Sequence, residues 1–154
     1  MFGCCRTPRH GWRAVKPKAI ICDIDGTIAR RGDRSPYDMT KVGEDTLNLP
    51  VALFVRAMYS TGYSIVFTSG RDESARYDTK LWIEERVHIP FFDLLLRNTG
   101  DNRDDAAVKR EMLDSIRALY DIVVAIDDRN RVVDMWRDND VPCWQVCSRE
   151  EGDF

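Results

Sequence analysis

Two carboxylates lie two positions apart at the end of an apolar run, Lys18-Ala-Ile-Ile-Cys-Asp23-Ile-Asp25-Gly26-Thr27. Alternate residues of a strand share a face, so Asp23 and Asp25 can both point into one crevice if the extended geometry continues past the strand end. Two crowded carboxylates repel each other unless a cation or a shared proton relieves the repulsion. The pattern therefore indicates a functional site.

Two other interpretations of this pair come from its residue types. A strand that leads into an Asp-Gly turn is the simpler one, because Asp and Gly are ordinary turn residues. A calcium-binding EF-hand is excluded, because it would need a third Asp before the glycine, a glutamate six residues after it and a helix on each side. The choice between a turn and a site depends on the rest of the chain.

A second group of polar residues ends the apolar run Tyr63-Ser-Ile-Val-Phe-Thr-Ser69-Gly70-Arg71. A serine hydroxyl, backbone N–H groups and a guanidinium at such a strand end can bind an anion. A third group is Asp105 and Lys109, which share a face of a predicted helix because they lie four residues apart. Taken alone, such a pair is usually a surface salt bridge.

The fourth group ends the run Tyr120-Asp-Ile-Val-Val-Ala-Ile-Asp127-Asp128-Arg129. A nearly continuous apolar run is typical of a parallel strand that is buried on both faces. In open parallel sheets, ligand sites form beyond the carboxyl ends of the strands. One shared site at that edge explains why three apolar runs end in such residues.

The elements that must position these groups alternate along the chain. Apolar runs predict strands near 19–23, 63–68, 92–96, 122–127 and 142–147. Helical periodicity predicts helices near 50–61, 75–87, 104–120 and 130–138. This alternation predicts an α/β fold with a parallel sheet covered on both faces. Residues 28–49 show no clear periodicity, and segments of this length are usually functional flaps or disordered.

The order of these motifs resembles the haloacid dehalogenase (HAD) superfamily of aspartate-nucleophile phosphatases. Over roughly residues 18–154 it resembles more narrowly the phosphatase half of phage polynucleotide kinase-phosphatase. The segments that carry the narrower resemblance are Asp23 to Thr27, Gly32-Asp-Arg34-Ser-Pro-Tyr-Asp38, Asp105 to Lys109, Ala125-Ile-Asp-Asp-Arg, Val133-Asp-Met-Trp-Arg137 and Cys143-Trp-Gln-Val146. The resemblance implies a three-layer Rossmann-like HAD fold with a five-stranded parallel sheet, a small flap and no large cap, which would leave room for a macromolecular end.

The resemblance also implies a role for each matched residue. Asp23 would attack phosphorus and form an aspartyl-phosphate. Asp25 would protonate the departing sugar oxygen and then deprotonate the attacking water. Lys109 would neutralise the nucleophile and the phosphate, with Asp105 orienting its ammonium group. Substrate or phosphate contacts would come from Thr27, Arg34, Ser69, Gly70 and Arg71.

We also expect a bound magnesium ion, because a carboxylate that faces an anionic phosphate is repelled unless cations intervene. Mg²⁺ prefers oxygen ligands and keeps several waters. The resemblance places Asp23, the backbone carbonyl of Asp25 and the pair Asp127 and Asp128 around it. Which of the last two would bind the metal directly stays open at this point.

Composition sets the outer bounds. The chain has 154 residues, of which 44% are hydrophobic and 32% charged, as in soluble globular domains. Because it has neither an 18-residue apolar run nor the apolar core of a signal peptide, we expect no membrane contact and a cytoplasmic location, in the host if the protein is viral.

The formal net charge of −3 divides into +5 for residues 1–18 and −8 for the rest. A basic arm over residues 1–17, before a phosphatase domain over 18–154, could contact nucleic-acid phosphates or be a solvated tail.

These observations together predict a polynucleotide 3′-phosphatase that acts on DNA or RNA ends before ligation. A 5′-kinase activity is not predicted, because the chain has no Gly-x-x-x-x-Gly-Lys-Ser/Thr loop. A separate 5′-kinase and a ligase are expected as functional partners. Two alternatives remain: a phosphatase for nucleotides or other small phosphomonoesters, and a non-catalytic module that binds nucleic-acid ends or serves as a partner subunit. DNA or RNA preference, the handling of 2′,3′-cyclic phosphate and the oligomeric state are left undecided by the sequence.

Overall fold

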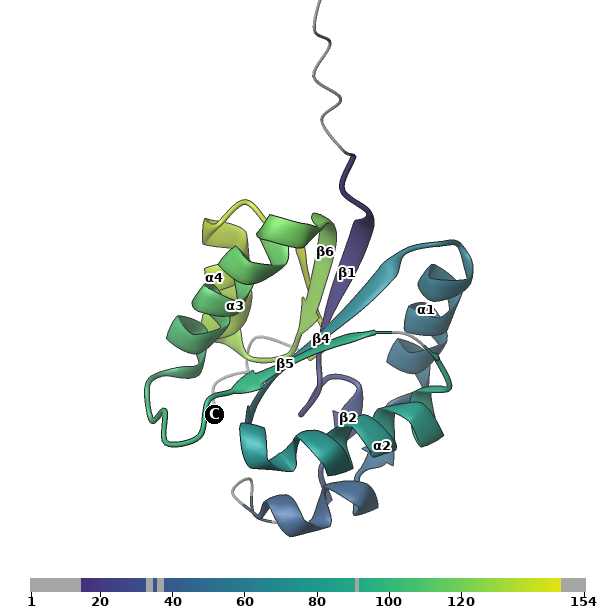
Figure 1. Ribbon diagram of the computed structural model, residues 1–154, viewed down its shortest axis with the longest axis vertical. Coiled ribbons are helices and arrows are strands. Elements are labelled where there is room, and N and C mark those ends of the chain that lie inside the picture. The colour runs from purple at the N-terminus through teal and green to yellow at the C-terminus, as the bar shows by residue number, and fades with distance from the viewer. Residues whose placement is uncertain (1–14, 33–34, 36–37, 91, 148–154) are drawn as a thin grey trace, which may run out of the picture.

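Five parallel strands form one sheet in the order β5-β4-β1-β6-β7 in the computed structural model, which describes residues 15–32, 35, 38–90 and 92–147. The strands are β1 (Lys18–Asp23), β4 (Ser64–Asp72), β5 (Asp93–Arg97), β6 (Asp121–Asp127) and β7 (Cys143–Gln145). The helices are α1 (Leu49–Ser60), α2 (Arg76–Val87), α3 (Asp105–Leu119) and α4 (Asn130–Asp138). Figure 1 shows α1 and α2 on one side of the sheet and α3 and α4 on the other, so the predicted three-layer α/β fold is confirmed.

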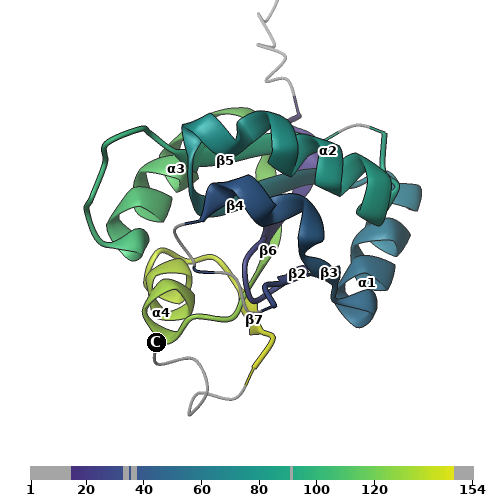
Figure 2. The ribbon, with the colours of Figure 1, turned by 90° about the horizontal axis from the view of Figure 1, so that it is seen from below.

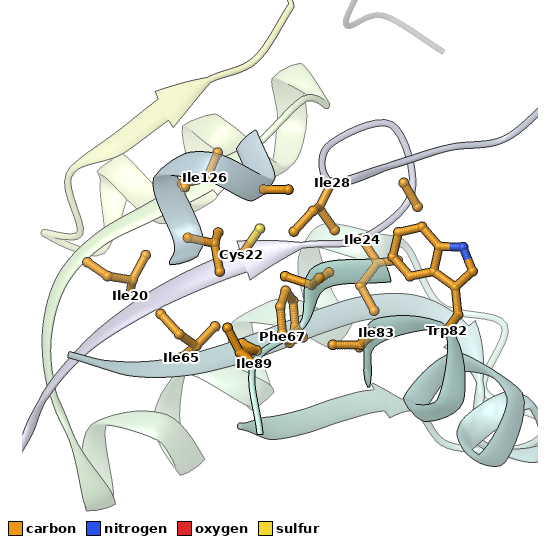
Figure 3. Close-up of a cluster of buried hydrophobic side chains, with 14 of the residues drawn as sticks. Ile20, Cys22, Ile24, Ile28, Ile65, Phe67, Trp82, Ile83, Ile89 and Ile126 are labelled. Atoms are coloured by element: carbon orange, nitrogen blue, oxygen red, sulfur yellow. The ribbon is translucent and has the colours of Figure 1, made fainter. Parts of the chain in front are cut away.

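The central strand β1 is buried on both faces, which explains its continuous apolar sequence. Ile20 and Cys22 face the layer of α1 and α2, where Phe67 of β4 and Trp82 of α2 complete one apolar cluster (Figure 3). On the opposite face, the cluster under α3 and α4 contains Ala19, Ile21, Leu113, Ile116, Val133 and Trp136. Two cores therefore fix the position of β1, the strand that ends at Asp23.

The strand β4 is longer than predicted and contains the second polar group. The prediction ends this strand near residue 68, but β4 continues through Ser69, Gly70 and Arg71 to Asp72. Pairing with β5 shifts register between Ser69 and Asp72 and then resumes. Strand pairing on both sides thus holds Gly70 and Arg71 between Ser69 and Asp72, which the hydrophobic pattern does not reveal.

The flap between β1 and α1 consists of short elements: β2 (Ala29–Arg30), the 3₁₀ helix η1 (Met39–Glu44) and β3 (Thr46–Leu47). The strands β2 and β3 pair antiparallel, and η1 contacts α2. In Figure 1 the flap lies below the sheet, where β1 and β4 end, and Figure 2 looks onto this end. The described part of this connection is a small flap, as predicted, and holds no large cap.

Two further predictions concern the N-terminal arm and contact with a membrane. The basic arm predicted over residues 1–17 lies largely outside the described residues, so the division into an arm and a domain stays a prediction. The longest helix of the described chain, α3, has 15 residues, whereas a bilayer requires about 20 apolar residues. None of the described helices could therefore span a membrane.

Candidate active site

A tight turn after β1 presents the first carboxylate pair. Hydrogen bonds from the Ala29 N–H to the Ile24 carbonyl (2.8 Å) and from the Gly26 N–H to the Ala29 carbonyl (2.9 Å) close this turn. Gly26 has a φ of +86°, and a Cβ there would lie 2.0 Å from Asp128 Oδ2. The turn thus needs glycine for both its conformation and its closeness to the carboxylates that follow β6.

Three buried carboxylates gather beyond the ends of β1 and β6. Asp23, Asp127 and Asp128 each offer an oxygen, and these oxygens lie within 4.8 Å of one another. Burial raises the pKa of Asp23 well above its usual range, and the charges of Asp127 and Asp128 add to this effect against the lowering by Lys109. Burial and the charge of Asp127 likewise raise the pKa of Asp128.

A single buried ammonium group lies among these carboxylates. Lys109 Nζ donates to Asp23 Oδ1 at 2.5 Å and to Asp127 Oδ2 at 2.9 Å. It also lies 3.7 Å from Asp105 Oδ2, so the predicted pair on α3 is present. Burial alone would lower the pKa of Lys109, but the charges of Asp127, Asp23 and Asp105 outweigh burial and raise it. Lys109 is therefore a fixed positive charge beside Asp23.

The chemistry of the acidic cluster fits a divalent metal. Two of the three carboxylates contact one ammonium group, and the third does not, which leaves an excess of negative charge on oxygen ligands that hard cations prefer. Asp127 is held by the protein, because it accepts hydrogen bonds from Lys109, from Trp136 Nε1 (3.2 Å) and from the N–H groups of residues 128 and 129 (3.1 and 3.3 Å). Asp128 Oδ1 accepts from Thr27 Oγ1 at 3.2 Å.

Asp25 lies apart from the acidic cluster and is held by Arg71. Arg71 Nε donates to Asp25 Oδ2 at 2.7 Å, Arg71 Nη2 donates to Oδ1 at 2.8 Å, and Ser69 Oγ donates to Oδ2 at 3.2 Å. Arg71 also bonds Asp45 Oδ2 (2.6 Å) and Thr79 Oγ1 (3.2 Å), and it is almost fully buried. These contacts go to protein groups, so the phosphate contact expected of Arg71 stays a prediction, as does metal binding by the Asp25 carbonyl.

The remaining predicted contacts have distinct surroundings. Thr27 is fully buried and bonds Asp128, so its predicted phosphate contact is also untested. A Cβ on Gly70 of β4 would lie 2.6 Å from Asp105 Oδ1, so a side chain there would displace the carboxylate at the start of α3. Arg34 lies outside the described residues.

A cavity of about 690 Å³ joins these groups. The predicted residues that line it are Asp23, Asp25, Ser69, Gly70, Arg71, Asp105, Lys109, Asp127 and Asp128. The separate sequence groups therefore meet in one site at the carboxyl edge of the sheet, as the sequence predicts.

Sequence reasoning missed several residues around this cavity. Arg97 Nη2 lies 3.2 Å from Asp105 Oδ1, and Arg97 Nε donates to the Gly70 carbonyl at 3.1 Å. Arg129 Nη1 lies 3.5 Å from Asp105 Oδ2. Both arginines could have been found, because Arg97 ends β5 at the same sheet edge and Arg129 directly follows the last carboxylate pair. Asp45 had no such signal, since it lies in a flap without periodicity.

Comparison with known proteins gives one family for this arrangement. Residues 17–154 match the family model described as the polynucleotide kinase PNKP phosphatase domain, a HAD family. A protein of Autographa californica nuclear polyhedrosis virus, named as a candidate bifunctional polynucleotide kinase/RNA ligase, is 35% identical over 135 residues, which are 85% of this chain and 20% of the viral protein.

Solved structures agree on the fold. A chain of the Pnkp1/Rnl/Hen1 RNA repair complex is 39% identical and superposes with a TM-score of 0.83, covering 90% of this chain and 44% of that one. A class C acid phosphatase from Bacillus anthracis, 20% identical with a TM-score of 0.59 over 81% of this chain and 62% of that one, shares the fold alone. The chain spans about a fifth of the viral relative and less than half of the repair-complex chain.

Proposed function

The chain belongs to the polynucleotide kinase phosphatase family of the HAD superfamily, and we propose from this premise that it removes the 3′-phosphate from DNA or RNA ends through an aspartyl-phosphate. The observation that carries the proposal is the pairing of two differently held carboxylates in one cavity. Asp23 contacts the buried Lys109, whereas Asp25 contacts Arg71 and Ser69. A nucleophile and a proton-transfer group need such different surroundings.

In the first step, an Asp23 oxygen attacks phosphorus while the bond from phosphorus to the sugar 3′-oxygen breaks. Asp25 donates a proton to that departing oxygen, so the nucleic acid leaves with a free 3′-hydroxyl. Lys109 holds the Asp23 carboxylate in place and offsets part of the negative charge that gathers around the phosphoryl group.

In the second step, water attacks the phosphorus of the aspartyl-phosphate, and the bond from phosphorus to the Asp23 oxygen breaks. Asp25, now ionised, accepts the proton of this water. Inorganic phosphate leaves, and both aspartates return to their starting states. Ser69 and the Gly70 N–H are proposed to bind phosphoryl oxygens during both steps.

Mg²⁺ is the proposed metal, held by Asp23, Asp127, Asp128 and the backbone carbonyl of Asp25. It would supply positive charge that offsets the repulsion between the nucleophilic carboxylate and the phosphate. The buried cluster has three carboxylates, and the positive charge of one lysine does not balance them, which supports this choice of a hard cation.

End healing is the proposed setting. The names of the relatives join this kind of phosphatase to a polynucleotide kinase, to an RNA ligase and to RNA repair. We therefore propose that the phosphatase prepares nucleic-acid ends together with 5′-kinase and ligase activities. It would meet such ends in the cytoplasm, which for a viral protein is that of the host.

The experiment that tests the substrate compares phosphate release from four kinds of compound. These are an oligonucleotide with a 3′-phosphate, as DNA and as RNA, the same oligonucleotide with a 5′-phosphate, a 3′-mononucleotide and an aryl phosphate. We expect kcat/KM to be highest for the 3′-phosphorylated oligonucleotide. Equal values for all compounds would instead indicate a phosphatase of small phosphomonoesters.

A further inference from the structure

A row of three charged side chains leads from the interior of the flap to the cavity. Asp45 Oδ2 lies 2.6 Å from Arg71 Nη2, and Arg71 Nε lies 2.7 Å from Asp25 Oδ2. The exposed fractions of the side chains are 0% for Asp45, 1% for Arg71 and 29% for Asp25. Asp25 and Arg71 line the cavity, whereas Asp45 lies behind them and does not. We propose that Asp45 is a positioning residue that acts through Arg71 to orient the Asp25 carboxylate for proton transfer.

The two hydrogen bonds between Arg71 and Asp25 fix these groups relative to each other, and Ser69 Oγ also donates to Asp25 Oδ2 at 3.2 Å. Two contacts of the guanidinium fix it relative to the protein: Asp45 Oδ2 accepts from Nη2, and Thr79 Oγ1 accepts from Nη1 at 3.2 Å. Because an arginine side chain has many rotamers, a charged partner on the far side of the guanidinium limits its rotation. Asp45 is the charged one of these two partners, and it therefore contributes to where Arg71 holds Asp25.

Asp45 is itself fixed to the body of the protein. Its backbone carbonyl accepts a hydrogen bond from Trp82 Nε1 of α2 at 2.8 Å, and both groups are buried. Its backbone N–H donates to the Val42 carbonyl and closes the end of η1. The flap and α2 therefore set the position of the Asp45 carboxylate, although Asp45 lies 20 residues after Asp25 in the sequence.

A change of Asp45 should affect some substrates more than others. This inference rests on the proposed role of Asp25, whose proton is needed only when the departing oxygen is a poor leaving group. A sugar or alkyl oxygen requires the proton, whereas a dinitrophenolate departs without it. Misplacing Asp25 should therefore slow cleavage of alkyl phosphates much more than formation of the aspartyl-phosphate from a dinitrophenyl phosphate.

The test uses Asp45→Asn, which keeps the shape but removes the charge, and Asp45→Ala, with Glu44→Gln as the matched control. Glu44 is the exposed neighbour of Asp45 in the same flap, so this control also removes one carboxylate charge but leaves the contacts of Asp45 with Arg71 intact. Rates are measured on a 3′-phosphorylated oligonucleotide, on a simple alkyl phosphate and on aryl phosphates whose leaving groups differ in acidity. Thermal unfolding shows which variants are folded, and Asp45→Asn carries the test if Asp45→Ala is not.

For Asp45→Asn we expect kcat on alkyl phosphates to fall at least about tenfold, part of the 10²–10⁴-fold that a general acid contributes, with KM little changed. The initial burst of dinitrophenolate should stay close to that of the wild type. Glu44→Gln should leave the rates on all substrates close to those of the wild type. An equal loss on all substrates for Asp45→Asn, or the same leaving-group dependence for Glu44→Gln, would overturn the inference.

The same experiment separates this inference from the proposed function. If the wild type hydrolyses alkyl and aryl phosphates but not 3′-phosphorylated ends, the proposed substrate is wrong, and the leaving-group comparison still decides the role of Asp45. If the wild type hydrolyses none of these compounds, both the proposed function and the role of Asp45 are rejected.

Discussion

At the scale of single residues, one ammonium group holds the site together. Lys109 is 2% exposed and contacts Asp23, the proposed nucleophile, and Asp127, a proposed metal ligand. A buried ion pair adds little net stability, but a buried charge that loses its partner is costly. We therefore expect Lys109 to be needed for the folded state as well as for the proposed catalysis.

Replacing Lys109 with Met tests this dual role. In EDTA at neutral pH, Lys109→Met should lower the free energy of unfolding by about 3–5 kcal/mol, because buried carboxylates lose their cationic partner. Urea denaturation measures this change. The matched control is Lys80→Met, which breaks an exposed pair with Glu84 on α2 and should change stability by less than about 1 kcal/mol. Similar losses in the two variants would contradict the account.

At the scale of elements, the turn after β1 joins the proposed nucleophile to the proposed metal site. Gly26 approaches Asp128 so closely that no side chain fits between them, and its backbone has a positive φ. The backbone conformation and the close contact impose separate requirements, which two glycine substitutions can separate.

Gly26→Ala should lose stability and metal-dependent activity together. A positive φ costs a residue with a Cβ about 1–2 kcal/mol, and the new Cβ would also displace Asp128. Gly62→Ala is the control, because Gly62 has a φ of +93° and open space around it, so it should lose similar stability and keep full activity. Denaturation and the metal concentration for half-maximal phosphate release measure both effects. Normal activity in Gly26→Ala would show that the close contact is unimportant.

The same scale shows which elements the sequence could reveal. Helix and strand positions follow from apolar periodicity, so α4 and most of β1 and β6 agree with prediction within a residue or two. The continuation of β4 to Asp72 was missed, because it depends on pairing with β5 across a register shift. The flap contacts of Asp45 were missed for a similar reason, since they join residues far apart in sequence and follow no local pattern.

At the scale of the whole molecule, the site makes stability depend on pH and on metal. The pKa values of Asp23 and Asp128 are raised mainly by burial. The folded protein therefore keeps these protons at a pH where the unfolded chain has released them. Without metal, these two carboxyl groups should therefore lower the free energy of unfolding as the pH rises. The loss begins near pH 4, the ordinary range of carboxyl pKa values, and is complete once the pH has passed the raised pKa values of the folded protein.

Metal binding should reverse this loss. Because the ligands must be ionised to bind a cation, the gain in Tm on adding Mg²⁺ should increase from about pH 5 to about pH 8. Differential scanning calorimetry with Mg²⁺ or with EDTA measures this gain. Asp128→Asn is the control and should show a smaller gain at every pH. A gain in the wild type that does not change with pH would contradict the proposed ligands.

The central claim is that Asp23 is the nucleophile of a metal-dependent 3′-phosphatase. The most direct measurement is phosphate release from a 3′-phosphorylated oligonucleotide with Mg²⁺, with EDTA and by the Asp23→Asn variant, beside a 5′-phosphorylated control. The account predicts release from the 3′ end with Mg²⁺ only, and none by Asp23→Asn. Release that continues in EDTA, or in folded Asp23→Asn, would contradict it.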